Sequence, residues 1–518
     1  MWKAAPWRCR RGDRRFDGTA DRLSFTCQGV PVMRPAIRFL ADELIERIVA
    51  EAIELLTTLG VEIHNPQAVD LLASHGAKVS ADRFRVYLSE ELVRRAIAAA
   101  PRSFRLFDVQ GRLTHDFTQD AVYFTPGSAA LYFLEYPSGQ LRRPTTEDYI
   151  RYVHLVEQLT YIASQSTAMV PADVPADISD SYRLFLSLLY GRKPVVTGAF
   201  SAEGFAVMRD LQLIVRRSQA DLEAKPLTIF SACPTSPLRW SYGPSQNLLD
   251  CARHGVPVEL IAMPLSGFQA PVSLVGTLIQ HTAETLSGVV LSQLARPGAP
   301  VLYGGSPAIF DVRQETTPMG AMETMMLDCA YCEIGKYLGL PTQAYIGMSD
   351  AKQLDAQAGL ESGVGAVLAV LARINNVSGP GMLDFENCQS LEKLVLDNEL
   401  CGMAMRLGAG IQPRDDFPAL PLFEELLRER HLLIADHTRR WLKEEIHFPG
   451  PVIDRTRRQR WQQQGSPTLL ERAHQEAERL IRSAPPSPLG EEVRRELEAR
   501  MEAEARRFGL DRLPPRPE

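Results

Sequence analysis

The chain has 518 residues, of which 45% are hydrophobic and 23% are charged, and its formal net charge is −6. This composition is that of an ordinary globular protein of one to three domains, and the slightly acidic balance argues against a nucleic-acid partner. No apolar run approaches the about 20 residues that a membrane-spanning helix needs, so we predict no membrane partner.

Residues 1–32 are rich in arginine and lack the apolar core of a secretory signal. Met33-Arg34-Pro35 would be a natural start of translation. We therefore expect residues 1–32 to form a disordered arm or to reflect an upstream start assignment. A targeting or basic tail is the less favoured alternative.

The eight cysteines are sparse and show no disulfide framework, which is typical of reduced thiols in a cytoplasmic protein. Cys329 and Cys332 form a CxxC pair within a helical pattern. A zinc or redox site would need a second ligand pair or a thioredoxin-like context, and neither accompanies the pair. We predict buried thiols here and no metal site.

Apolar residues recur at helical spacing from Leu40 to Leu56, and Gly60 follows as a stop signal. Two shorter helical patterns cover residues 68–74 and 89–99. The pattern therefore predicts an all-helical N-terminal region over residues 33–103.

From Phe104 the pattern changes to short strands, and apolar runs then alternate with helical patterns. Near-continuous apolar runs indicate strands that are buried on both faces, as in a parallel sheet. Most of the runs begin with proline, which suits the first position of a strand. The seven runs are residues 161–166, 194–199, 226–231, 257–263, 300–305, 341–346 and 375–379.

Seven strand–helix steps approach the eight of a TIM barrel. The eighth strand is either Ala121–Thr125 or a segment after Leu394, and the sequence does not decide between them. An open doubly wound sheet is the alternative, but no GxGxxG phosphate loop follows a strand. We predict an α/β fold, a TIM (β/α)8 barrel over residues 104–415.

The composition changes again after Arg414. Charged amphipathic helix patterns cover residues 417–427, 431–445, 468–482 and 491–508. We therefore predict a helical C-terminal extension over residues 416–518. Its charged helices would permit a homo-oligomer.

In a barrel, the loops that follow the strands converge on one face, where active sites are built. The predicted loops carry small residues, hydroxyls and thioethers, and Asp350 is the one carboxylate that falls clearly within them. They contain no HExxH motif, no pair of carboxylates for hydrolysis and no evident Ser-His-Asp set. The glycines that follow the strands either allow a bulky planar ligand to approach the backbone or are ordinary turn residues.

Several motifs in order carry a family resemblance from about Ala36 to about Leu489. The most specific is GMSDAKQLDAQAGLES, residues 347–362; CPTSPL at 233–238, GPGML at 379–383 and LVLDN at 394–398 accompany it. Together they resemble the trimethylamine:corrinoid methyltransferase family, in which this segment carries pyrrolysine directly before Ser-Asp-Ala-Lys, and specifically a member that lacks pyrrolysine, like the glycine betaine methyltransferases. Met348 stands at that position here.

The resemblance implies a TIM barrel that transfers a methyl group from a methylated amine to the Co(I) corrinoid of a cognate corrinoid protein. Pyrrolysine is thought to activate trimethylamine by binding it, and Met348 cannot form such an adduct. A quaternary ammonium needs no activation, because it leaves as a neutral tertiary amine. The departure therefore favours a quaternary amine such as glycine betaine, carnitine, proline betaine or choline.

The resemblance also suggests roles for particular residues. Met348 and Asp350 are the candidate catalytic residues, with Asp350 either balancing the ammonium charge or capping the following helix. Aromatic faces hold quaternary ammonium groups, although core packing is the plainer explanation for each ring. The candidate substrate-binding residues are Tyr345, Tyr303, Phe230, Phe268 and Ser349, with Phe310 a further ring and Lys352 and Arg313 candidates for a substrate carboxylate.

The candidate corrinoid-facing residues are Gly304, Gly305, Ser306, Gly379 and His281. The alternative for His281 is a structural role, as a histidine on a helix face whose hydrogen bonds are satisfied within the protein. The corrinoid would arrive on the partner protein, and no metal would bind directly. Three other hypotheses remain open. The chain binds a betaine or the corrinoid protein without turnover, acts on trimethylamine or another methyl donor, or is a zinc-dependent barrel hydrolase or lyase.

Overall fold

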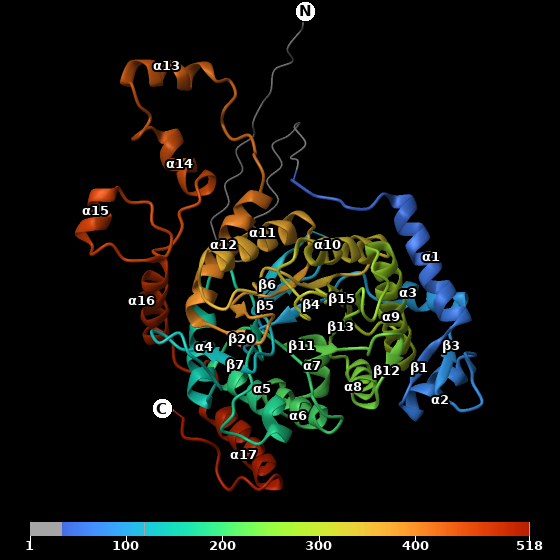
Figure 1. Ribbon diagram of the computed structural model, residues 1–518. Coiled ribbons are helices and arrows are strands. Elements are labelled where there is room, and N and C mark those ends of the chain that lie inside the picture. Colours follow the sequence, from blue (N-terminus) through green and yellow to red (C-terminus); the bar gives the residue numbers. More distant parts are fainter. Residues whose placement is uncertain (1–33, 119, 517–518) are drawn as a thin grey trace, which may run out of the picture. The chain divides into compact units, whose positions relative to one another are not determined.

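The computed structural model describes residues 34–118 and 120–516, which fall into two units (Figure 1). The larger unit comprises Ala36–Met405 and, from Pro449, the rest of the described chain. The smaller unit comprises Arg406–Phe448 with residues 34–35.

Parallel strands occupy the centre of the larger unit. Five of them pair side by side in the order β15-β13-β11-β10-β9, and three more pair in the order β17-β18-β6. All the pairings within these two sheets are parallel. The bounds are β6 Tyr123–Thr125, β9 Gln165–Ser166, β10 Val195–Thr197, β11 Thr228–Ala232, β13 Val258–Ala262, β15 Val301–Gly305, β17 Gln343–Tyr345 and β18 Asn376–Ser378.

Single parallel bridges link the edges of these two sheets. Phe124 in β6 bridges to Ile162, just before β9, and Tyr303 in β15 bridges to Thr342, just before β17. The segment 121–125 is thus a parallel strand beside β18, whereas the chain after Leu394 lies in helix α12 (Leu391–Gly408). Of the two candidates for a further strand, the earlier segment was therefore right.

Each of the seven predicted apolar runs contains one of the strands from β9 to β18, which confirms the alternating α/β reading. The prolines before these strands still join the sheet, because their carbonyl groups accept bonds although they have no N–H to donate. The carbonyl of Pro257 accepts from the amide of Phe230 at 2.9 Å, and that of Pro341 accepts from Tyr303 at 2.8 Å.

Helices separate consecutive strands and lie around them (Figure 1). The longest, α9, is buried on nearly all sides because α1 and α3 cover the surface that it turns away from β13 and β15. Their bounds are α4 Thr146–Gln158, α5 Ser179–Tyr190 with a 3-10 turn at Ala176–Ile178 before it, α6 Gly204–Arg216, α7 Gln219–Ala224, α8 Tyr242–Arg253, α9 Leu274–Ala295, α10 Met322–Tyr337 and α11 Ala356–Leu371.

The N-terminal region contains the predicted helices α1 (Asp42–Thr58), α2 (Pro66–Ser74) and α3 (Glu90–Ala99). The prediction that it is all helical was wrong, because three short strands lie between them: β1 Val61–Ile63, β2 Lys78–Val79 and β3 Arg85–Tyr87. β1 pairs in parallel with β12 (Arg239–Trp240), from the loop after β11. Two- and three-residue strands have too little length to show a period in the sequence.

The two ends of the parallel strands are covered differently. At the amino end, the antiparallel pair β4 (Arg105–Phe107) and β5 (Leu113–Asp116) packs Phe104, Leu106 and Phe117 against Val196, Ile229 and Leu302. Beyond the carboxyl ends, short strands form two further sheets: β7 Tyr132–Leu134, β8 Leu141–Arg142, β19 Met382–Leu383 and β20 Cys388–Gln389 in one, and β14 Leu265–Ser266 and β16 Ala308–Ile309 in the other.

The predicted C-terminal helices are present, with one more that the sequence did not reveal, α15 (Arg458–Gln463). α16 (Leu469–Arg482) packs on α4, and α17 (Glu491–Arg507) packs on α5 and α6. The smaller unit contains α13 (Leu420–Glu429) and α14 (Asp436–Glu445). Across the described ranges, no helix combines the length and apolar character that crossing a membrane would require.

Candidate functional site

The loop after β17 turns sharply against helix α11. Gly347 has a φ of +84°, a conformation that glycine adopts without strain. A Cβ on Gly365 of α11 would lie 2.6 Å from the amide nitrogen of Gly347, so the close approach of helix and loop requires glycine at position 365. Met348 follows and is only 1% exposed, in the same apolar cluster as Tyr345 and Met382.

Glu361 of α11 holds the next two residues in place. One carboxylate oxygen accepts bonds from the hydroxyl of Ser349 at 2.5 Å and from the amide of Asp350 at 2.8 Å. The other oxygen accepts from the side chain of Gln357 at 2.9 Å. The glutamate thus fixes the loop from the helix that follows it.

Asp350 binds backbone amides rather than a helix end. Its two oxygens accept from Met319 at 2.9 Å and from Gly320 at 2.8 Å, so it joins the loops after β16 and β17. The capping alternative for Asp350 was wrong, because Asp355 caps α11 through the amides of Gln357 and Ala358. Burial raises the pKa of Asp350 to about 6.

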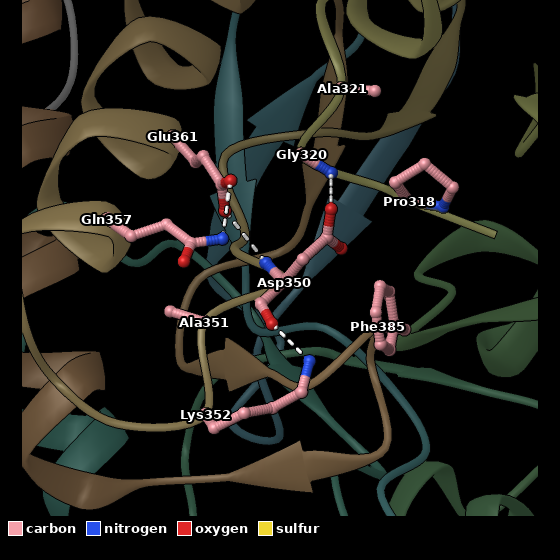
Figure 2. A pocket seen from close by; sticks show the side chains of 9 residues that line it. All are labelled: Pro318, Gly320, Ala321, Asp350, Ala351, Lys352, Gln357, Glu361 and Phe385. Carbon is pink, nitrogen blue, oxygen red and sulfur yellow. Dashed lines mark hydrogen bonds between the residues drawn. The ribbon is translucent and has the colours of Figure 1, made fainter. Parts of the chain in front are cut away.

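A pocket of about 410 Å³ opens beside this loop (Figure 2). Asp350, Lys352 and Phe385 are among its walls, together with Pro318, Gly320, Ala321, Ala351, Gln357 and Glu361. The Lys352 ammonium donates to the carbonyl of Asp350 at 2.6 Å and lies 3.8 Å from the centre of the Phe385 ring. The pocket therefore combines a cation, an amide and carboxylates beyond the carboxyl end of β17.

The turn between β19 and β20 forms one wall of this pocket. Asp384, Phe385 and Glu386 have φ values of 51°, 57° and 70°, a conformation that is costly for residues with a side chain. Contacts hold the turn in place: Lys352 pairs with Asp384 at 3.0 Å, and the Asp384 amide donates to Ala351 at 3.0 Å. Such strain persists where the surrounding structure overdetermines it, which is common at ligand sites.

A polar network joins the two parallel sheets. Glu259 of β13 accepts from the Ser231 hydroxyl at 2.7 Å and from the Asn376 amide at 3.0 Å. Asn376 in turn accepts from the Thr125 hydroxyl at 2.9 Å. Glu259 is fully buried, and burial raises its pKa to about 7 although both hydrogen bonds lower it.

Tyr345 lies beside this network, near the carboxyl ends of the strands. Its side chain is 6% exposed, hydrogen-bonds the side chain of Ser128 and lies within electrostatic reach of Glu259, Glu386 and Cys233. Burial, and then the two glutamates, raise its pKa well above the usual value. Glu386 is partly exposed, accepts from the Ser128 amide at 3.3 Å, and has a pKa that burial raises to about 8.

Neither glutamate was predicted from the sequence. Glu259 does leave a signal, because it is the one charged residue in the apolar run 257–263. A carboxylate inside a buried strand is expensive and marks a functional candidate. Glu386 leaves no such signal, since only the fold of its turn brings it to Tyr345.

Two of the predicted aromatic residues lie between strands and helices. The Tyr303 hydroxyl donates to Thr282 of α9 at 2.9 Å, and Phe230 packs edge-on against Phe205 of α6. Phe268 lies instead in the loop after β14, where it is 65% exposed and stacks on Phe310. Of the four predicted substrate-binding rings, Tyr345 is the one at the end of β17, the strand that leads into the loop of Met348, Ser349 and Asp350.

The predicted corrinoid-facing residues also divide into groups. His281 is fully buried behind β15, where it bonds the carbonyl of Gly304 at 3.1 Å and stacks on Tyr331 at 4.3 Å. A Cβ on Gly305 would clash with this histidine at 2.1 Å, whereas one on Gly304 would meet Gln343 at 2.5 Å. Ser306 follows β15 and is 8% exposed.

Gly379 follows β18 and lies against the backbone before Met348. A Cβ there would lie 2.4 Å from the carbonyl oxygen of Ile346, which explains glycine at this position. Arg313, a candidate for the substrate carboxylate, is exposed and pairs with Asp311 at 2.6 Å. Within residues 34–118 and 120–516, no three His, Cys, Asp or Glu side chains gather as potential metal ligands.

Comparison with known proteins identifies relatives along nearly the whole chain. The sequence profile described as "Trimethylamine methyltransferase (MTTB)" matches residues 8–509, a range that starts within the segment 1–32, outside the described residues. Trimethylamine methyltransferase MttB of Desulfitobacterium hafniense (strain DSM 10664 / DCB-2) is 26% identical over 472 residues, 91% of this chain and 95% of that protein.

Two further relatives are similar to a comparable degree. Trimethylamine methyltransferase MttB of Methanosarcina barkeri is 28% identical, over 89% of this chain and 94% of that protein. The glycine betaine methyltransferase of Desulfitobacterium hafniense (strain Y51) is 27% identical, over 90% of this chain and 96% of that protein.

Among solved structures, the monomethylamine methyltransferase MtmB of Methanosarcina barkeri aligns with a TM-score of 0.50 at 11% identity. The alignment covers 91% of this chain and 88% of MtmB, and at this identity it shows a shared fold alone. The family itself is shown by the sequence match over residues 8–509. The chain therefore belongs to the trimethylamine methyltransferase (MTTB) family.

Proposed function

We propose that the chain transfers a methyl group from a quaternary amine to the Co(I) corrinoid carried by a separate protein. The observation that carries this proposal is Met348, at the position where the family resemblance implies pyrrolysine. Met348 is 1% exposed and lies in one apolar cluster with Tyr345. Its thioether is soft, does not react with amines and tolerates a neighbouring cation.

The chemistry of the donor explains why a thioether suffices. When a quaternary ammonium loses a methyl group, the N–CH3 bond breaks and its electron pair stays on nitrogen, so the product is a neutral tertiary amine. The electron pair of Co(I) forms the new bond to carbon. The protein has only to hold the N–CH3 carbon in line with the incoming corrinoid, which is a positioning task.

We further propose that the parallel strands close into a TIM (β/α)8 barrel. The two bridges, Phe124–Ile162 and Tyr303–Thr342, support closure at both junctions between the sheets. The bond from Asn376 to Glu259 also supports it, because it crosses from one sheet to the other. In such a barrel, Met348 and Asp350 lie at the carboxyl end of the strands, where barrel enzymes place their chemistry.

Within the quaternary amines, we propose a betaine such as glycine betaine. Lys352 and Gln357 line the 410 Å³ pocket and offer a cation and an amide for a substrate carboxylate. Asp350 and Ser349 stiffen the loop beneath them through Gly320 and Glu361. The similarity to a relative named glycine betaine methyltransferase supports the same choice.

The cognate corrinoid protein would dock at the carboxyl ends of the strands. Exposed apolar side chains follow β10, β13, β14 and β15, which suits a docking face. They are Phe200, Met263, Phe268, Val272 and Val312. Gly304, Gly305, Ser306 and Gly379 lie at or just after the ends of β15 and β18 on the same side, while His281 would support β15 from behind.

The deciding experiment is demethylation by the purified protein with Co(I) corrinoid, both free and on its carrier protein. The panel contains trimethylamine, glycine betaine, carnitine, proline betaine and choline, and the change in cobalt absorption is the readout. We expect methylcobalamin with at least one quaternary amine and none with trimethylamine. Turnover of trimethylamine would contradict the argument from Met348. Binding of a betaine without turnover by folded protein would favour a binding role.

A further inference from the structure

Two buried polar atoms beside Tyr345 have no hydrogen-bond partner in the described part of the chain. They are the hydroxyl of Ser378, which is 2% exposed, and the side-chain nitrogen of Gln343, which is fully buried. Ser378 pairs in register with Tyr345, and Gln343 pairs with Asn376, whose side chain reaches Glu259. Paired residues of adjacent parallel strands face the same side, so both atoms point to the space beside Glu259 and Tyr345.

The same space is flanked by two carboxyl groups. Glu259 enters from β13, and Glu386 enters from the turn after β19, where its position is held by the Ser128 amide. Both act on the Tyr345 side chain, and Glu259 also acts on Glu386. Neither glutamate forms an ion pair with Lys, Arg or His in residues 34–118 and 120–516.

We propose that Glu259 and Glu386, with the ring of Tyr345, form the counter-ion site for the substrate's ammonium group, and that cation binding there expels a proton. This rests on the proposed function, because it assumes a quaternary amine as ligand. A quaternary ammonium donates no hydrogen bond, so carboxylate charge and an aromatic face are what remains to recognise it. Two neighbouring carboxylates without a cation as partner, one fully buried and one partly exposed, would repel each other unless one carries a proton or a cation lies between them.

The pKa values of the surrounding groups support the exchange of a proton for the substrate cation. Burial raises the pKa of Glu259 to about 7 and that of Glu386 to about 8, so the pair retains at least one proton near neutral pH without a ligand. The other titratable groups that face them are Tyr345, Cys233, Tyr331 and Asp328, and burial raises the pKa of all four. None of the four supplies a positive charge that could replace the ligand.

The turn that carries Glu386 also faces the pocket. Phe385 lines the pocket, and the next residue bonds Ser128, so one turn connects the pocket with the interior. Lys352 fixes this turn through Asp384.

The test is calorimetric titration of the whole protein with tetramethylammonium, in two buffers that differ in ionisation enthalpy. We expect up to about one proton released per cation near neutral pH, and an affinity that rises about tenfold to a hundredfold from about pH 6 to about pH 9. A neutral probe of similar bulk, tert-butanol, should bind without proton release. The affinity rises with pH because the bound cation favours the ionised carboxylate. Below the pKa of that carboxyl group, binding must therefore release its proton.

Glu259→Gln and Glu386→Gln should each weaken tetramethylammonium binding by about tenfold and reduce the released proton. The matched control is Glu284→Gln, a buried carboxyl that bonds Ser236 and the amide of Leu238 away from this space. Absent binding, or binding without proton release and without pH dependence in the wild type, would overturn the proposal. Those results are distinct from failure of the proposed function, which appears as no demethylation of any quaternary amine.

Discussion

Asn376 donates its side-chain amide to Glu259 at 3.0 Å, although the two residues lie on strands of different sheets. This bond orients a carboxyl that is fully buried and has no cation as a partner in the described chain. Towards the amino ends of the strands, Val196, Ile229 and Leu302 pack against the β4–β5 hairpin, so the strands carry apolar side chains there and polar ones around Glu259. The Asn376–Glu259 pair marks the floor of the candidate site.

Replacing Glu259 by glutamine should change how stability depends on pH. Folding raises the pKa of Glu259 from 4.5 to about 7. The protonated side chain therefore contributes its full stability to the fold below about pH 4.5, and this stability is lost as the pH rises through about 7. Glutamine never ionises, and its oxygen can accept from the Asn376 amide while its NH2 group donates to the Ser231 hydroxyl, so one of the two bonds reverses direction. We expect Glu259→Gln to unfold with a free energy on the order of 2 kcal/mol higher than wild type near pH 8.5, and with little difference near pH 5.

Denaturant unfolding at the two pH values measures this difference. Asn376→Ala serves as the comparison, because it removes the amide that stabilises the ionised form and should be more destabilising at the higher pH. An equal effect of Glu259→Gln at both pH values would show that Glu259 does not titrate between them.

Substitutions of Met348 should show whether demethylation depends on the size of this side chain or on its lack of charge. Met348→Leu keeps nearly the same volume in a site that is 1% exposed, and it should retain most of the demethylation rate with a stability loss below about 1.5 kcal/mol. Met348→Lys adds a cation where the ammonium is expected to approach, and it should abolish turnover. Rates with the preferred quaternary amine and thermal unfolding of both variants provide the measurement. Loss of activity in the leucine variant as well would give the thioether itself a chemical role.

Lys352 should matter for betaines and not for choline. Lys352→Met keeps the aliphatic stem over Phe385 but removes the charge at the pocket, so the KM for glycine betaine should rise about tenfold. Choline has no carboxylate, and its KM should change little. Arg313→Met is the matched control, because Arg313 is exposed and paired with Asp311. Equal effects of Lys352→Met on both substrates would place the carboxylate elsewhere.

Alanine at Gly379 should disturb the loop that carries Met348. Its Cβ would lie 2.4 Å from the Ile346 carbonyl oxygen, and one of the two backbones would have to move. We expect a loss of about 2–4 kcal/mol in the free energy of unfolding and a lower demethylation rate. Gly359→Ala is the control, since that helical glycine of α11 has open space around it and alanine should stabilise the protein by about 0.5–1 kcal/mol. Similar stabilities of the two variants would contradict the close approach.

The sequence determined the larger features of this protein by itself. Buried parallel strands must be apolar on both faces, so the apolar runs between Tyr161 and Gly379 could be identified from the sequence. The motif around Met348 identified the family, because many residues in order are specific where single residues are not. The same reasoning failed for β1, β2 and β3, which are too short to show a period.

The tertiary structure alone decided which side chains meet. Tyr303, Phe230 and Tyr345 all lie on strands. Only the direction of each side chain shows that the first two contact helices, whereas the third points towards Glu259. Glu259 and Glu386 are 127 positions apart, and a strained turn brings the second to the first. Periodicity reports burial along one element, whereas a site depends on the register of several strands and on loop conformations that no local pattern encodes.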